Sequence, residues 1–226
     1  PDEFFRKEFE NSKIMLPEVG HFGVGMVFLP SNPQRAKLAI DSIETAIRNE
    51  NQELITWRDV PVDSNVLGKT VKDNAPIIKQ FFVKMGNTVL SESEFARKLY
   101  VIRKQSLHLL AKTDDDWDDF YIVSLSTRTI IFKGMVLAPN LSKFYLDFQN
   151  HNFKSAIALF HQRFSTNTFP SWRLAQPFRY LCHNGEINTV RGNSNWLNAR
   201  RYSMVSDLLK NDLNKLWPII EKSPSD

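Results

Sequence analysis

The sequence predicts a layered protein in which helices pack on a sheet, and three observations lead to this. The run at 21–29 is rich in Val and Phe, as buried strands are. The segment 31–48 places apolar residues at spacings of three and four, the period of an amphipathic helix. A short strand candidate follows at 54–57, and a helix leading into such a strand is half of a layered unit.

The first 60 or so residues can be interpreted element by element. The charged and aromatic stretch 1–11 predicts a short helix. Gly23 and Gly25 form a G-x-G within the first strand candidate, but the third glycine of a dinucleotide-binding fingerprint is absent. We interpret both glycines as positions where another part of the protein packs close to the backbone. In the helix at 31–48, Pro33 suits the first turn, and Ser31 or Asn32 precedes it as the cap.

The middle of the chain predicts a second strand and helix pair. The polar stretch 65–74 predicts a surface loop, and 77–83 predicts a strand. Ser91 and Glu94 form a capping box at the start of a helix. Its apolar residues are expected to face inward and its basic residues outward, namely Phe95, Leu99, Ile102 and Leu109 against Arg97, Lys98, Arg103 and Lys104.

The acidic run 114–119 lacks the glycine and closing glutamate of a calcium-binding loop, so it predicts a solvated turn. The segments 120–125 and 129–132 predict a hairpin, and 138–148 predicts a helix. Two further helices are expected, one at 189–209, capped by Asn188, and one at 212–221. The residues expected to pack the first of these helices are mostly Trp196, Leu197, Ala199, Tyr202 and Met204.

Composition limits the class of protein. The 226 residues carry 29 basic and 25 acidic side chains, a net charge of +4, with no basic cluster of the kind that nucleic-acid binders concentrate on one face. A single cysteine excludes a disulfide framework and a cysteine-based zinc site, and it fits a reducing compartment. No apolar run approaches the length of a membrane span. We therefore expect neither nucleic acid nor membrane as a partner.

The stretch 156–198 carries most of the chemistry. Two short apolar runs, 157–160 and 178–182, predict strands that end in polar loops. Arg163 can hold a carboxylate with two parallel hydrogen bonds. Asn184 offers an amide donor and Gly185 an unhindered backbone N–H, a pair that can stabilise an oxyanion. The alternative interpretation is an ordinary Asn-Gly turn at the end of a strand.

The phrases RFSTNTFPSW, AQPFRYL and HNGEINTVRGN resemble the glutaminase domain of glutamate synthases, a class II glutamine amidotransferase of the N-terminal-nucleophile hydrolase type. Weaker similarity through GVGMVFLP, SEFARKLYVIRK and YIVSLSTRTIIFKGM extends the resemblance over nearly the whole chain. It implies an α+β fold, a four-layer αββα sandwich. Residues 1–226 would form a partial, N-terminally truncated amidotransferase domain.

The resemblance also implies roles for individual residues. Arg163 matches the arginine that binds the α-carboxylate of glutamine, and Asp226 the aspartate that binds its α-amino group. Thr166 belongs to the loop that covers glutamine, and Phe169 to Trp172 would shape that loop. Asn184 and Gly185 match the catalytic oxyanion pair, with His183 supporting them.

The family's nucleophile is a cysteine at the mature N-terminus, whereas this chain begins with Pro1 and its one cysteine is Cys182. Successive residues of a strand point to opposite faces, so His183 is not expected to act as a base for Cys182. Two interpretations follow: an excised, inactive piece of a glutaminase domain, or a glutamine-binding or structural module that lacks the nucleophile. A third, a phosphoribosylamine- or asparagine-forming amidotransferase, is disfavoured by FSTNTFPSW and EINTVRGN.

For the full enzyme, the resemblance implies hydrolysis of glutamine to glutamate and ammonia, and transfer of the ammonia to 2-oxoglutarate for reductive glutamate synthesis. FMN, a 3Fe-4S cluster and NAD(P)H or ferredoxin would serve later domains, with no cofactor in this chain. The partners would be glutamine and the remaining glutamate synthase domains, in the cytoplasm or a plastid. An exposed sheet edge in a truncated domain favours a homo-oligomer.

Overall fold

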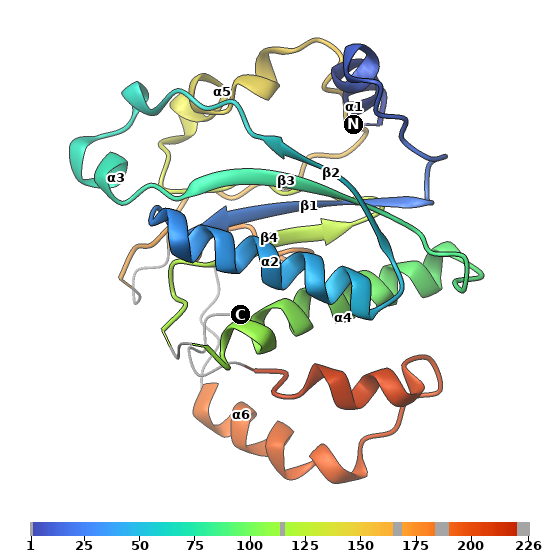
Figure 1. Cartoon of the computed structure of the whole chain (residues 1–226). Helices are drawn as coiled ribbons and strands as arrows, with labels where there is room; N and C mark the ends of the chain where they lie inside the picture. The colour runs from blue at the N-terminus through green and yellow to red at the C-terminus, as the bar shows by residue number, and fades with distance from the viewer. Residues whose placement is uncertain (1, 114–115, 165–168, 184–189, 221–226) are drawn as a thin grey trace.

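A four-stranded antiparallel sheet forms the centre of the computed structural model, which describes residues 2–113, 116–164, 169–183 and 190–220 (Figure 1). The strands lie in the order β2-β3-β1-β4. They are β1 (Phe22–Leu29), β2 (Glu53–Asp59), β3 (Ile77–Lys84) and β4 (Tyr121–Ser126). All eight residues of β1 are buried, because this central strand is covered on both faces.

One face of the sheet is covered by α2 (Pro33–Asn49) and α4 (Glu92–Leu110), which lie beneath it in Figure 1. Both predicted caps are confirmed: Asn32 Oδ1 accepts from the backbone N–H of Gln34 and Arg35, and Ser91 Oγ accepts from that of Glu94. Glu94 Oε2 accepts the N–H of Leu90 instead of that of Ser91, so the capping box is displaced by one residue.

The two glycines of β1 lie where these helices and β3 approach the strand. A Cβ atom on Gly23 would lie 2.5 Å from Leu99 Cδ1, and one on Gly25 would lie 2.2 Å from Phe81 Cε1. Both distances are too short for non-bonded carbon atoms, so close packing is confirmed as the reason for the glycines.

The opposite face is covered by α1 (Asp2–Phe9), η1 (Glu10–Ser12) and the short helical turns η3 (Ala138–Asn140), α5 (Leu141–Phe144) and η4 (Leu146–Gln149). Aromatic rings dominate this layer. Phe5 and Phe9 of α1 each pack edge-on against Phe82 of β3, with ring centroids 5.0 Å apart. Edge-to-face packing at this spacing adds to the stabilisation from burial alone.

A buried ion pair ties this layer to the sheet. Arg58 of β2 donates from Nη1 and Nη2 to both carboxylate oxygens of Asp147, at 2.9 and 2.7 Å. Its Nε and Nη2 donate to Glu8 Oε1, and its Nη1 also donates to Gln80 Oε1. Burial alone lowers the pKa of Arg58, but the hydrogen bonds and charges of Asp147 and Glu8 outweigh that effect, and the pKa is raised.

Two predicted elements in the middle of the chain differ in the structure. The stretch 65–74 lies at the surface as predicted, but it is not a loop throughout, because η2 (Ser64–Val66) overlaps its start and α3 (Lys69–Asp73) lies within it. The predicted hairpin is also wrong, because 129–132 forms no strand. Ser124 Oγ accepts the N–H of Ile131, and Ser126 Oγ accepts that of Arg128, so side chains replace part of the expected ladder.

The C-terminal segment lies below α4 in Figure 1 and consists of α6 (Val190–Ala199), η5 (Arg201–Ser203) and η6 (Lys210–Leu216). The helix predicted over 189–209 therefore ends at Ala199, and the helix predicted over 212–221 is a 3-10 helix that begins two residues earlier. Trp196 and Tyr202 are exposed, so their predicted packing role is wrong.

The packing of η6 on α4 changes which side chains of α4 are buried. Val101 forms a cluster with Leu213 and Leu216, and Arg103 and Lys104 are also buried, contrary to the prediction that they face solvent. Two lysines, Lys98 of α4 and Lys215 of η6, donate to the buried carboxylate of Glu50, which follows α2. A helix face that appears polar in the sequence is therefore an interface in the fold.

The described residues thus form one antiparallel sheet with helices on both sides, in agreement with the predicted α+β class. Among these residues, no helix has both the length and the hydropathy that a bilayer span requires.

Candidate functional site

Neither apolar run of the chemically rich stretch forms the strand that was predicted for it. Phe178 and Leu181 exchange two short backbone hydrogen bonds, of 2.7 and 2.6 Å, and so close a tight turn. The segment 157–160 has no strand partner within the described residues, and the side chains of Ile157 and Phe160 are 83% and 80% exposed. A strand needs a neighbour for its N–H and C=O groups, and the described part of the chain supplies none here.

The two runs nevertheless meet in space. The thiol of Cys182 donates a hydrogen bond to the carbonyl oxygen of Phe160, with sulfur and oxygen 3.6 Å apart. Arg163 lies three residues beyond Phe160, and His183 directly follows Cys182. The fold therefore brings together the two loops to which sequence analysis assigned the site. Within the described residues, no hydrogen bond joins the Cys182 sulfur to the His183 ring.

Arg163 is exposed, and its backbone N–H donates to His161 Nδ1 at 3.2 Å. In the part of the chain that the structure describes, no carboxylate lies within ion-pair distance of its guanidinium group. An exposed guanidinium group without such a partner can bind a carboxylate of another molecule through two parallel hydrogen bonds.

His183 is half-buried, and its backbone is held by one side chain. Gln176 Oε1 accepts the His183 N–H at 2.9 Å, and Gln176 Nε2 donates to the His183 carbonyl oxygen at 2.7 Å. One planar amide thus satisfies both backbone groups of His183, as a neighbouring strand would. The sequence patterns predicted no role for Gln176. The only feature of the sequence that pointed to a role for this residue was its position in the phrase AQPFRYL, seven residues before His183.

The segment that carries Gln176 is anchored in the aromatic core. Trp172 is buried, with its ring centroid 5.9 Å from that of Phe28 and 5.7 Å from that of Phe144. A Cβ atom on Gly134 would lie 2.4 Å from the Trp172 ring, so only glycine allows this packing. Trp172 therefore acts as an anchor at the end of the loop it was predicted to shape, whereas Phe169 is exposed.

Lys133 provides a second anchor for this segment. Its ammonium group is buried, donates to the carbonyl oxygen of Arg173 at 2.7 Å, and lies 4.5 Å from the ring centroids of both Tyr121 and Phe178. The attraction between a cation and the face of an aromatic ring is stronger where water is excluded. The Lys133 side chain thus fixes both ends of the stretch 173–178.

Four of the predicted site residues, Thr166, Asn184, Gly185 and Asp226, lie outside the described residues, as does the predicted cap Asn188. Their roles stay predictions. Arg163 and His183 are the described members of the set, and the contacts above place them on loops that meet.

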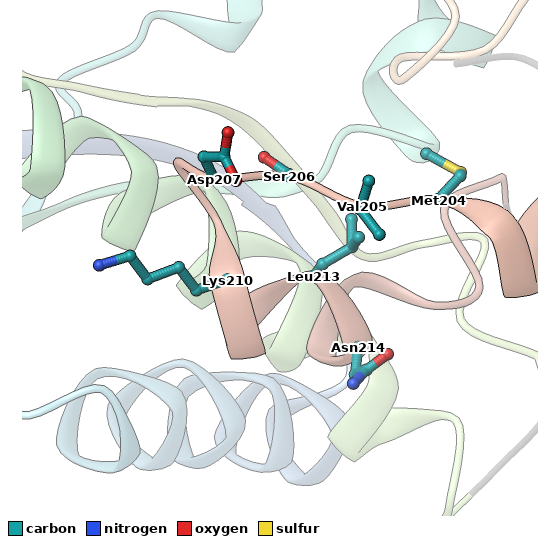
Figure 2. A pocket seen from close by; sticks show the side chains of 7 residues that line it. All are labelled: Met204, Val205, Ser206, Asp207, Lys210, Leu213 and Asn214. Atoms are coloured by element: carbon teal, nitrogen blue, oxygen red, sulfur yellow. The ribbon is translucent and has the colours of Figure 1, made fainter.

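A separate open pocket of about 360 Å³ lies in the C-terminal segment. Figure 2 shows that its lining side chains come from η6 and from the loop just before it. They are Met204, Val205, Ser206, Asp207, Lys210, Leu213 and Asn214. Neither Arg163 nor His183, the predicted site residues that the structure describes, lines this pocket. Over the described ranges, no three His, Cys, Asp or Glu side chains are grouped to hold a metal ion.

The chain is similar to known proteins over its full length. The large chain of glutamate synthase (NADPH) from Bacillus subtilis (strain 168) is 44% identical over 231 residues, a match that covers 100% of this chain and 14% of the relative. The ferredoxin-dependent glutamate synthase of Pyropia yezoensis is 40% identical over 227 residues, which is again 14% of its length. The glutamate synthase (NADH) of Saccharomyces cerevisiae is 40% identical over 235 residues, or 11% of its length.

The chain thus spans about one seventh or less of the length of these curated relatives. A family model for class-II glutamine amidotransferases matches residues 1–226, the whole of the sequence. The chain therefore belongs to the class-II glutamine amidotransferase family.

Proposed function

We propose that this chain is the glutaminase portion of a glutamate synthase, which hydrolyses glutamine to glutamate and ammonia. The observation that carries the proposal is the family match over all 226 residues, together with relatives from bacteria, algae and fungi that are all glutamate synthases. In the proposed whole protein, the ammonia passes to 2-oxoglutarate in a later domain for reductive glutamate synthesis.

The proposed substrate clamp recognises the two fixed charges of an amino acid. Arg163 binds the α-carboxylate of glutamine, and Asp226 binds its α-ammonium group. Thr166 contacts the substrate from the covering loop. The exposure of Arg163, and the lack of a carboxylate partner for it among the described residues, support this assignment.

In the proposed reaction, a cysteine thiolate attacks the side-chain amide carbon of glutamine. Asn184 and Gly185 donate hydrogen bonds to the oxyanion that forms. The C–N bond then breaks, and the nitrogen leaves as ammonia with the proton that the nucleophile's own α-amino group had taken from the thiol. Water hydrolyses the thioester, which releases glutamate and restores the thiol.

We propose that this nucleophile is a cysteine outside the 226 residues and that the chain alone is inactive. The hydrogen-bond partner of the Cys182 thiol is the carbonyl oxygen of Phe160, which cannot take up the proton that a thiol must lose to become a nucleophilic thiolate. Within the described part of the chain, Cys182 also lacks a hydrogen-bonded base, which an activated nucleophile requires.

The proposed complete domain is a four-layer αββα sandwich of the N-terminal-nucleophile hydrolase type. The segment 157–160 supports this proposal. Ile157 and Phe160 are of residue types that are enriched in strands, yet their side chains are exposed, as expected of a strand that lacks its neighbour. A second sheet would supply that neighbour. The same unpaired segment is the basis for proposing that the isolated chain forms homo-oligomers.

The residues of this chain do not fit an iron–sulfur cluster, which needs several cysteine thiolates, because Cys182 is the only cysteine. For this reason we place the proposed 3Fe-4S cluster in another domain. FMN and the electron donor, which is NADPH, NADH or ferredoxin, are likewise proposed to act outside this chain. The proposed location of the whole protein is the cytoplasm or a plastid.

The test is to measure glutamate release from glutamine by this chain and by a form extended at its amino terminus to include the proposed cysteine. We expect activity in the extended form only, and retention of that activity after Cys182→Ser. Activity in the 226-residue chain that Cys182→Ser abolishes would contradict the proposed nucleophile. Glutamine binding without hydrolysis in both forms would instead indicate a binding module.

A further inference from the structure

We propose that Gln176 is a positioning residue for glutamine hydrolysis. Its side-chain amide holds the backbone of His183, from which the predicted oxyanion donors Asn184 and Gly185 follow directly along the chain. The inference rests on the proposed function and adds to it a residue that does not touch the substrate.

The two hydrogen bonds define both the position and the direction of the His183 backbone. Gln176 accepts from the N–H at 2.9 Å and donates to the C=O at 2.7 Å, and both distances are those of well-formed bonds. Because one rigid amide plane makes both bonds, it restricts rotation as well as translation of this part of the chain. In the described structure, no strand makes this pairing with His183.

Gln176 can fulfil this role because its own backbone is fixed. The preceding residue, Ala175, is buried, and Trp172 lies in the aromatic core. The ammonium group of Lys133 holds the carbonyl oxygen of Arg173. A continuous path of packed and hydrogen-bonded groups therefore leads from the core of the sheet to the His183 backbone. Sites whose supporting residues are locked by packing keep their geometry through the reaction.

Such support affects the transition state more than the bound substrate. Oxyanion donors must lie about 2.7–3.1 Å from the oxygen that becomes charged, and a misplacement of about 1 Å can lower the rate about 100-fold. The α-carboxylate and α-ammonium groups of glutamine are bound elsewhere, by the proposed Arg163 and Asp226. Loss of the Gln176 amide is therefore expected to lower kcat and to leave KM nearly unchanged.

The test compares three variants of the full-length protein in glutamine hydrolysis. Gln176→Ala removes both bonds and is expected to lower kcat about 100-fold, with KM within about threefold of the wild-type value. Gln149→Ala is the matched control, because Gln149 also donates its amide to a backbone carbonyl, that of Ser142, but on the α5–η4 turn. Its kcat and KM are expected to stay at wild-type values.

Gln176→Glu separates positioning from space filling. The ionised carboxylate keeps the acceptor for the His183 N–H but faces the His183 carbonyl without a proton to donate. Protonation restores the donor, so the kcat of this variant relative to wild type is expected to rise as the pH is lowered. If the ratio of kcat in Gln176→Glu to kcat in wild type does not change with pH, the proposal is overturned. It is also overturned if Gln176→Ala keeps the wild-type kcat, or if its KM rises by the same factor as its kcat falls.

Hydrogen exchange at the His183 amide provides a readout independent of activity. We expect faster exchange in Gln176→Ala than in wild type or Gln149→Ala, with core amides of β1 unchanged. Unchanged exchange at His183 would overturn the proposed clamp. A wild-type protein without glutaminase activity would overturn the proposed function, and with it the catalytic role of Gln176, even where the exchange result confirms the contact.

Discussion

Asp147→Asn tests how much the buried ion pair between β2 and η4 stabilises the fold. The side chains of Arg58 and Asp147 are only 7% and 2% exposed, and two hydrogen bonds join them. The substitution keeps the size of the side chain but removes its charge and turns one acceptor into a donor that faces a guanidinium N–H. Arg58 then remains as a buried cation that Glu8 alone neutralises.

Removal of one partner from a buried ion pair costs about 3–5 kcal/mol. Because Glu8 still accepts two bonds from Arg58, we expect a loss at the lower end, about 3 kcal/mol. For a domain of this size, that loss lowers Tm by about 6–12 °C. Urea denaturation of the 226-residue chain, followed by circular dichroism, measures the change in the free energy of unfolding.

The matched control is Asp59→Asn, since Asp59 pairs with Lys79 across β2 and β3 but is 79% exposed. An exposed pair contributes at most about 1 kcal/mol, so this variant is expected to unfold close to wild type. Equal losses in the two variants would refute the argument from burial. A second check combines Asp147→Asn with Arg58→Met, which is expected to cost less than the sum of the two single changes.

Three further changes have equally definite outcomes. Hydrogen bonds from Arg128 and then Thr127 hold the pKa of Glu92 at about 2, below its ordinary 4.5, so its stabilising effect is present above pH 4.5 and is lost as the pH falls through 2. The difference in Tm between wild type and Glu92→Gln is therefore expected to become smaller as the pH is lowered from 4.5 to 2. Glu50→Gln is expected to raise hydrogen exchange in η6 about tenfold or more, because it removes a buried partner from two lysines. Asn184→Ala is expected to lower kcat about 100- to 1,000-fold with little change in KM.

Each of these has its own contrary result. A constant difference in Tm between wild type and Glu92→Gln from pH 5 to 2 would show that the Arg128 contact does not act through charge. Exchange in η6 that stays at the wild-type rate in Glu50→Gln would show that apolar packing alone holds this segment on α4. Equal effects of Asn184→Ala on kcat and on glutamine binding would argue against an oxyanion role.

Local patterns predicted the elements whose stability depends on nearby residues. The apolar spacing of α2 and the cap at Asn32 are properties of a single helix, and the structure confirms both. The strand at β1 was equally clear, because Val and Phe fill it and Gly23 and Gly25 admit close neighbours. Such signals lie within one element and need no knowledge of its partners.

The misassignments arose where distant residues decide the outcome. The basic residues Arg103 and Lys104 of α4 are buried, and Val101 of the same helix packs on Leu213 and Leu216 of η6, about 110 positions later in the chain. Residues 129–132 form no strand because the hydroxyls of Ser124 and Ser126 accept backbone N–H groups there. Propensity within a short window does not contain this information.

For the candidate site, the sequence by itself determined the family, the chemical types of the groups and the loops that carry them, because residue identity sets what each group can donate, accept or bind. Only the tertiary structure decided which of these loops meet. The contact of Cys182 with Phe160 and the clamp of Gln176 on His183 join residues that lie 22 and seven positions apart. Such contacts depend on how the anchored segment 172–178 packs on the sheet, and packing between distant segments is a property of the folded chain as a whole.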